Sequence, residues 1–117
     1  MSEDEGGSDW DFVTQRNETA WTVHHLNTEK GVALGTPITL DLHLEPQDDA
    51  DEDALLRALA MFGYTAEAVT SEETAYVQVT VPEVAFDVEA IWTHEERVTK
   101  IALTRGFAPD GWGFWEP

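Results

Sequence analysis

The sequence predicts an α+β domain in which helices cover one face of a four-stranded antiparallel sheet. Two segments, 38–45 and 75–81, alternate strictly between apolar and polar residues, as half-buried strands do. Two others, 55–62 and 88–102, place apolar residues at helical spacing. With two weaker strands, the order β-α-β-β-α-β follows one added N-terminal helix, which is the ferredoxin-like arrangement. In that arrangement the first and third strands, here 38–45 and 75–81, are central and the two weaker strands are edges.

The chain opens with a short acidic segment and continues with a helical pattern. Residues 1–9 contain nothing to bury, so we expect a disordered lead-in, with residues 10–117 forming a single domain. Between Trp10 and Leu26 the apolar residues fall near one helical stripe. That stripe consists of Phe12, Val13, Ala20, Val23 and Leu26. Glycines and a proline at 31–37 mark a loop after this helix.

The first strand and the second helix have clear boundaries. Pro46 stops the strand at 38–45, and the carboxylates at 48–53 favour the start of a helix, whose positive end attracts negative charge. Gly63 stands where a C-terminal cap is expected. The buried stripe of this helix is Leu55, Ala58, Leu59 and Phe62.

The second half of the chain repeats the plan. We expect a weak strand at 64–70, a hairpin loop, and a strand at 75–81 that Pro82 ends. Asp87 caps a helix that Gly106 closes, and 110–115 is a short aromatic strand opened by an Asp-Gly turn. The sheet face away from the two helices carries polar residues, unless the N-terminal helix covers it. These are Thr39, Asp41, His43, Tyr76, Gln78 and Thr80.

The charge limits the partners. The chain has 24 Asp and Glu against 6 Lys and Arg, a net charge of −18 over 117 residues. Such a surface repels phosphate backbones and anionic lipids and attracts basic surfaces. The scarcity of lysine also resembles the surface of a halophilic protein. No apolar run approaches the ~20 residues of a membrane span, so we expect a soluble cytoplasmic protein.

No motif specifies a reaction or a cofactor, and we expect neither catalytic residues nor a metal site. Cysteine is absent, no Gly-x-Ser-x-Gly occurs, and adjacent His24 and His25 diverge by about 100° on a helix. His94-Glu95-Glu96 is expected to be solvated on its helix. Direct RNA binding is not expected either, since only Tyr76 places an aromatic ring on the open faces of the central strands.

The C-terminal aromatic segment is the candidate functional feature. Trp112 and Phe114 share one face of the strand and are expected to pack under the helices. Trp115 points the other way and is a candidate interface anchor. Gly111 is expected to take a positive φ after Asp110.

This segment resembles the near-terminal Tyr-Asp-Gly-Trp-Gly of the family of regulator of ribonuclease activity B (RraB), the inhibitors of ribonuclease E. It reads Pro109-Asp110-Gly111-Trp112-Gly113-Phe114-Trp115. Three earlier stretches also resemble family motifs: Gln15-Arg16-Asn17-Glu18-Thr19, Leu42-His43-Leu44 and Ala60-Met61-Phe62-Gly63-Tyr64. The resemblance covers about residues 10–115. It implies a ferredoxin-like fold with one leading helix, and a non-enzymatic protein that binds the endonuclease and alters its RNA cleavage.

The leading hypothesis is therefore an acidic regulator that docks on the basic surface of a protein partner, with an RNA-processing endonuclease as the candidate. The predicted partner-binding residues are Asp41, His43, Asp110, Gly111, Trp112, Gly113 and Trp115. The alternative is a small-ligand sensor built as a dimer, whose open sheet face or helix groove holds a metabolite. The oligomeric state stays open.

Overall fold

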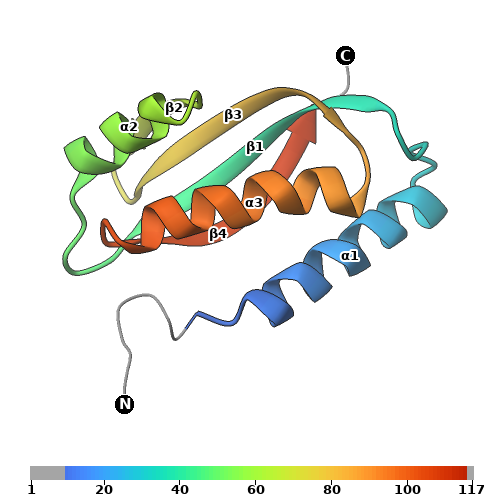
Figure 1. Cartoon of the computed structure of the whole chain (residues 1–117), viewed down its shortest axis with the longest axis horizontal. Coiled ribbons are helices and arrows are strands. Elements are labelled where there is room, and N and C mark those ends of the chain that lie inside the picture. Colours follow the sequence, from blue (N-terminus) through green and yellow to red (C-terminus); the bar gives the residue numbers. More distant parts are fainter. Residues whose placement is uncertain (1–9, 116–117) are drawn as a thin grey trace.

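The computed structural model of the protein describes residues 10–115, and these form three helices and four strands. In chain order they are α1 (Phe12–Glu29), β1 (Pro37–Pro46), α2 (Glu52–Met61), β2 (Thr65–Thr70), β3 (Ala75–Ala85), α3 (Val88–Leu103) and β4 (Phe107–Trp115). Figure 1 shows the helices arranged along the sheet. The predicted α+β fold with a leading helix is confirmed, whereas the expected disorder of residues 1–9 lies outside the described residues.

The sheet has the strand order β2-β3-β1-β4, and every neighbouring pair is antiparallel. The two strands with the best alternation, β1 and β3, are central, as predicted. The edges differ from them in length and regularity. β2 has only six residues, with the exposed Glu67 in its middle, and β4 contains Pro109 and an irregular register. None of the six residues of β2 is buried, whereas β1 and β3 each contain several buried residues.

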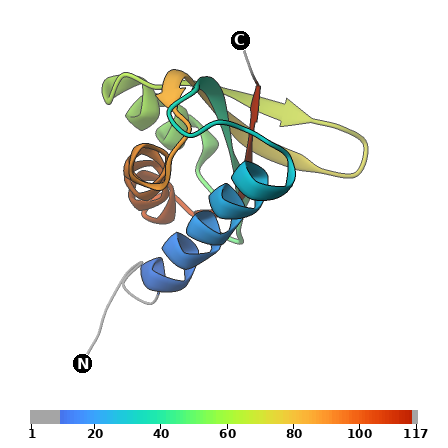
Figure 2. The same cartoon turned by 90° about the vertical axis from the view of Figure 1, so that its right-hand side faces the viewer.

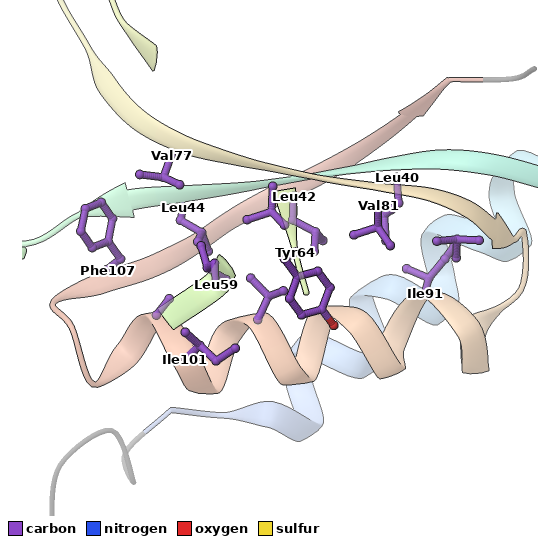
Figure 3. Close-up of a cluster of buried hydrophobic side chains, with 14 of the residues drawn as sticks. Leu40, Leu42, Leu44, Leu59, Tyr64, Val77, Val81, Ile91, Ile101 and Phe107 are labelled. Carbon is purple, nitrogen blue, oxygen red and sulfur yellow. The ribbon is translucent and has the colours of Figure 1, made fainter. Parts of the chain in front are cut away.

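The core lies between the sheet and the helices. Leu40 and Leu44 of β1 are fully buried, and so are Leu59 of α2, Val79 of β3 and Ile91 of α3. Figure 3 shows side chains from β1, β3 and the helices meeting in this layer. Burial of these branched side chains supplies the main stabilisation of the domain.

The leading helix lies alongside α3, on the side away from α2 (Figures 1 and 2). Its side chains meet α3 and the indole of Trp112, which shares a sheet face with the core residue Leu42. All three helices therefore lie on one side of the sheet. The polar face of β1 and β3 is not covered by α1.

The buried side of α1 differs from the apolar stripe that the sequence predicts. Its buried residues are Gln15, Thr19 and Val23, whereas Val13 is 72% exposed. The prediction was wrong at Val13, because two polar residues occupy the inner positions. Each of them has a hydrogen-bond partner on α3, which makes the burial of its polar atoms tolerable.

Two predicted strand boundaries were also wrong, and in both places the ladder continues through a bulge. β3 does not end at Pro82 but continues to Ala85, with Pro82 and Glu83 standing opposite the single residue Thr39. Glu83 takes a φ of 57° there. In β4, the Asp-Gly pair is not a turn that opens the strand, since β4 already begins at Phe107. An extra residue in one strand needs a local kink rather than an end.

The helix termini follow the sequence closely. Asp51 and Asp87 each accept a hydrogen bond from the backbone N–H three residues later, which caps α2 and α3. After α3, Gly106 has a φ of 79° and lies against the backbone of Asp49, where a β-carbon would collide with the carbonyl oxygen. Glycine is required there for both reasons.

Candidate partner-binding site

A groove of about 450 Å³ lies between α1 and β4, with one residue of α3 among those that line it. Its walls combine two tryptophans, three carboxylates and several hydroxyl or amide groups. The lining residues are Trp10, Asp11, Thr14, Gln15, Glu18, Thr19, Thr22, Glu95, Pro109, Gly111 and Trp112. The groove therefore brings the first helix and the C-terminal aromatic segment together.

Thr19 of α1 links β4 to α3 through two hydrogen bonds. Its side-chain hydroxyl donates to Oε1 of Glu95 at 2.5 Å and accepts from the indole Nε1 of Trp112 at 3.3 Å. Thr19 is only 2% exposed. One hydroxyl thus uses its donor on α3 and its acceptor on β4, and fixes the position of α1 relative to both.

Gln15, one turn earlier, extends the same network. Its side-chain Nε2 donates to Oε2 of Glu95 at 3.3 Å and to the hydroxyl of Thr99 at 3.1 Å. Its Oε1 accepts from the indole Nε1 of Trp10 at 2.8 Å. Both carboxylate oxygens of Glu95 therefore receive a hydrogen bond from α1, and both tryptophans of the groove use their N–H groups within the protein.

Glu95 lies at the inner end of this network and is 6% exposed. Burial raises the pKa of its carboxyl group, the hydrogen bonds from Thr19 and Gln15 oppose that rise, and the nearby charge of Glu18 adds to it. No described residue forms an ion pair with it. The expectation of a solvated Glu95 was wrong, because α1 packs over the side of α3 that carries it.

His94, on the neighbouring side of α3, is partly buried and contacts another side chain. Its Nδ1 lies 3.0 Å from the hydroxyl of Tyr64, which in turn accepts from Nη1 of Arg97 at 3.4 Å. Burial lowers the pKa of this imidazole, and the charge of Arg97 lowers it further. Glu96 pairs instead with Lys100 near the surface. Of the three residues expected to be solvated, two are held by side chains of other elements.

Most of the predicted partner-binding residues lie along the β1–β4 ladder. Asp41 stands opposite Gly113, and His43 stands opposite the bulge formed by Asp110 and Gly111. Gly111 has a φ of 99°, as expected after Asp110. The sequence separated these residues by some 70 positions, and the antiparallel pairing brings them together.

The two predicted tryptophans, Trp112 and Trp115, are placed differently from these residues. Trp112 turns its side chain to the helix side, where it lines the groove and is only partly buried. The backbone of Trp115 pairs with Thr39, but its side chain lies outside the described part of the structure. The predicted residues therefore belong to two surfaces, one on each side of β4.

The open sheet face has its own polar contacts. The hydroxyl of Thr80 donates to Oδ1 of Asp41 at 3.2 Å, and the rings of His43 and Tyr76 lie 5.2 Å apart. Asp41 is nearly buried despite the absence of a covering helix. Cross-strand pairs of this kind hold the face rigid.

Within residues 10–115, no three or more histidine, aspartate and glutamate side chains gather in a way that could hold a metal ion. The described helices also include none with the length and hydropathy required to cross a bilayer.

A family model described as regulator of ribonuclease activity B matches residues 3–114, nearly the whole chain. The chain belongs to this family. The matched segment contains every residue that lines the groove. Membership in the RraB family assigns the chain to proteins that regulate ribonuclease activity. A comparison with individually curated proteins finds no match.

Sequence reasoning missed Gln15, Thr19 and Glu95 as residues of the RraB groove. The available signal was the stretch from Gln15 to Thr19, which resembles a family motif although its residues are polar. Its two end residues are one helical turn apart, so both point to the same side of α1. A polar pair at that spacing on an inner helix face indicates a buried partner on another element.

Proposed function

We propose that this protein is an acidic, non-catalytic regulator that binds a ribonuclease and changes its cleavage of RNA in the cytoplasm. The observation that carries the proposal is the family match over residues 3–114. The net charge of −18 supports a basic docking surface on the partner, since complementary charge raises the association rate and the selectivity. The candidate partner is an RNA-processing endonuclease of the ribonuclease E kind.

The same charge argues that the regulator acts on the enzyme and not on its RNA substrate. Phosphate backbones are repelled by a surface on which carboxylates outnumber cations four to one, 24 against 6. The proposed binding residues remain the seven predicted from the sequence. They form the ladder surface (Asp41, His43, Asp110, Gly111 and Gly113), of which Gly111 also lines the groove, together with the groove residue Trp112, and Trp115.

The test is a cleavage assay with a purified ribonuclease E-type endonuclease from the same source and a fluorescent RNA. We expect the full chain to lower the cleavage rate in a saturable way, and the chain alone to leave the RNA intact. An unchanged cleavage rate at saturating regulator concentrations, or cleavage by the chain itself, would contradict the proposal.

Surface variants then locate the contact. Asp110→Asn and His43→Ala change the ladder surface, and Glu29→Gln, in the last turn of α1, removes one exposed charge away from it. We expect the first two variants to weaken inhibition more than Glu29→Gln. If the chain does not bind the ribonuclease and instead forms a dimer that binds a metabolite, the ligand-sensor alternative replaces the proposal.

A further inference from the structure

We propose that the groove between α1 and β4 receives an arginine side chain of the basic partner. This inference rests on the proposed function, since it names the chemical group through which the partner would be recognised.

The groove presents negative charge without a cation of its own. Asp11, Glu18 and Glu95 line it, and no lysine or arginine is found among the described residues of its lining. The described cations on the two helices are engaged elsewhere, and one of them, Arg97, donates to the hydroxyl of Tyr64 at 3.4 Å. Arg16 pairs with Glu89 at 2.6 Å, and Lys100 pairs with Glu96 at 3.6 Å. An incoming cation would therefore meet carboxylates that have no ion-pair partner among the described residues, of which Asp11 already accepts two hydrogen bonds from Thr14 as the cap of α1.

Of the three carboxylates, the inner one, Glu95, is the most informative. Glu95 is nearly buried and accepts hydrogen bonds only from the neutral side chains of Thr19 and Gln15. A carboxylate offers about four lone-pair sites, so two bonds leave acceptor capacity free. Glu18 stands close enough for its charge to raise the pKa of Glu95. A bound cation would relieve this repulsion.

The two indoles favour a planar cation over a compact one. Trp10 and Trp112 both line the groove, and both N–H groups are already donated to Gln15 and Thr19. The parts of the two indoles that remain available to a ligand are therefore their aromatic ring carbons. A guanidinium group stacks on such surfaces, is weakly hydrated, and binds carboxylates through two parallel N–H groups. An ammonium group shares the charge and the N–H donors, but it lacks the flat face and the paired N–H geometry and is more strongly hydrated.

The size of the groove also fits a side chain carried by a peptide. Its volume of about 450 Å³ lies within the range of small-ligand sites. It is open to solvent along α1, so a peptide backbone can pass outside while one side chain enters. The committed occupant is therefore an arginine within an exposed basic segment of the partner protein.

The test uses the full chain and two capped tripeptides, acetyl-Gly-Arg-Gly-amide and its lysine counterpart, at fixed ionic strength. The readout is the shift of the indole N–H signals in heteronuclear NMR spectra. We expect the arginine peptide to move the signals of Trp10 and Trp112 in a saturable way. Trp21, which is 66% exposed on α1 and outside the groove, should not move. The lysine peptide should bind at least about tenfold more weakly.

A matched pair of variants checks the carboxylates. Glu18→Gln should raise the dissociation constant of the arginine peptide by about threefold, as for a partly exposed ion pair. Glu29→Gln removes the same charge outside the groove and should leave it unchanged. Both residues are exposed, so neither variant should affect folding.

Three results would overturn the inference: equal shifts with both peptides, an equal shift at Trp21, or equal weakening by the two variants. These outcomes are separate from the cleavage assay. Arginine binding without an effect on the ribonuclease would remove the proposed function and keep the groove as an arginine site. Inhibition that Glu18→Gln leaves unchanged, without peptide binding, would keep the function and remove the groove from it.

Discussion

The indole N–H of Trp112 donates to the hydroxyl of Thr19 across 93 positions of sequence. This bond connects two of the stretches that resemble the family of regulator of ribonuclease activity B, one in the first helix and one in the last strand. Because the same hydroxyl donates to Glu95, three elements depend on one side chain. The geometry of the groove follows from this connection.

Thr19→Val should be strongly destabilising although its shape is nearly unchanged. The variant removes the donor to a buried carboxylate and the acceptor of the Trp112 indole, and should lower the free energy of unfolding by about 2–3 kcal/mol at neutral pH. Thr19→Ser keeps the hydroxyl and loses only a methyl group, for about 1 kcal/mol. Urea denaturation measures both. Equal losses in the two variants would show that the hydroxyl is unimportant.

Trp112→Ala should cost less than the 3–5 kcal/mol typical of a fully buried aromatic residue, because this indole is only partly buried. We expect about 2–3 kcal/mol by urea denaturation. Trp112→Phe keeps most of the packing, loses one hydrogen bond, and should cost about 1 kcal/mol. A variant Trp112→Ala that folds with unchanged stability but no longer binds the ribonuclease would make Trp112 a recognition residue alone.

Glu95 should make stability fall as the pH rises. Its pKa is raised in the folded state, so the folded protein holds this proton more tightly than the unfolded chain does. The resulting stabilisation is complete below the ordinary pKa of a glutamate, 4.5, and is lost as the pH rises through the folded pKa. Glu95→Gln lacks this dependence. Denaturant melts of both proteins at each pH between 4 and 7 check this. The free energy of unfolding of the variant should rise relative to that of the wild type as the pH increases. A constant difference would contradict this prediction.

Gly106→Ala should be far more damaging than the same change in the loop before β1. A β-carbon at Gly106 would collide with the Asp49 carbonyl, in a loop held by hydrogen bonds from Gln47 and Asp51 to this turn. We expect a loss above about 3 kcal/mol. Gly35 has a similar φ of 86° and open space around it, so Gly35→Ala should cost about 1 kcal/mol. Thermal melts of both variants check the difference, and similar melting points would contradict it.

Salt should stabilise the protein if its charge is an adaptation to a saline cytoplasm. The described residues form only two ion pairs between basic and acidic side chains, both with exposed partners, so most carboxylates repel one another. Potassium chloride shortens the Debye length from about 10 Å at 0.1 M to about 3 Å at 1 M, and the melting temperature should rise over that range. Sucrose at matched osmolality is the control. A melting temperature indifferent to salt would leave partner binding as the reason for the charge.

The sequence predicted the sheet and the caps well because these depend on local patterns. Alternation in β1 and β3 identified the central strands, and Asp87 and Gly106 marked the ends of α3. The buried face of α1 could not be predicted in this way, since Gln15 and Thr19 are polar and their burial depends on Glu95, some 80 positions away. The periodicity of hydrophobic residues in a sequence cannot reveal a buried polar network.

The two bulges were missed for a related reason. Pro82 and the Asp110-Gly111 pair carry local signals for ending or turning a strand, and those signals are the same whether or not a ladder continues. Only the partner strand β1 decides the outcome. Whether the residues proposed on β1 and β4 bind a partner stays a prediction, although alternation along the terminal motif already separated Trp112 and Phe114 from Trp115. The groove could not be predicted, because Thr19, Glu95 and Trp112 meet only once α1 packs against α3 and β4.

The two edges of the sheet also bear on how the protein behaves when it is crowded. β2 is short and places the charged Glu67 in its middle, and β4 is interrupted by Pro109, which has no amide hydrogen, and by the kink at Gly111. Neither edge offers an unbroken row of backbone groups to which a strand of another molecule could add. Copies released from their partner should therefore remain dispersed at high concentration, even in salt that screens their mutual repulsion.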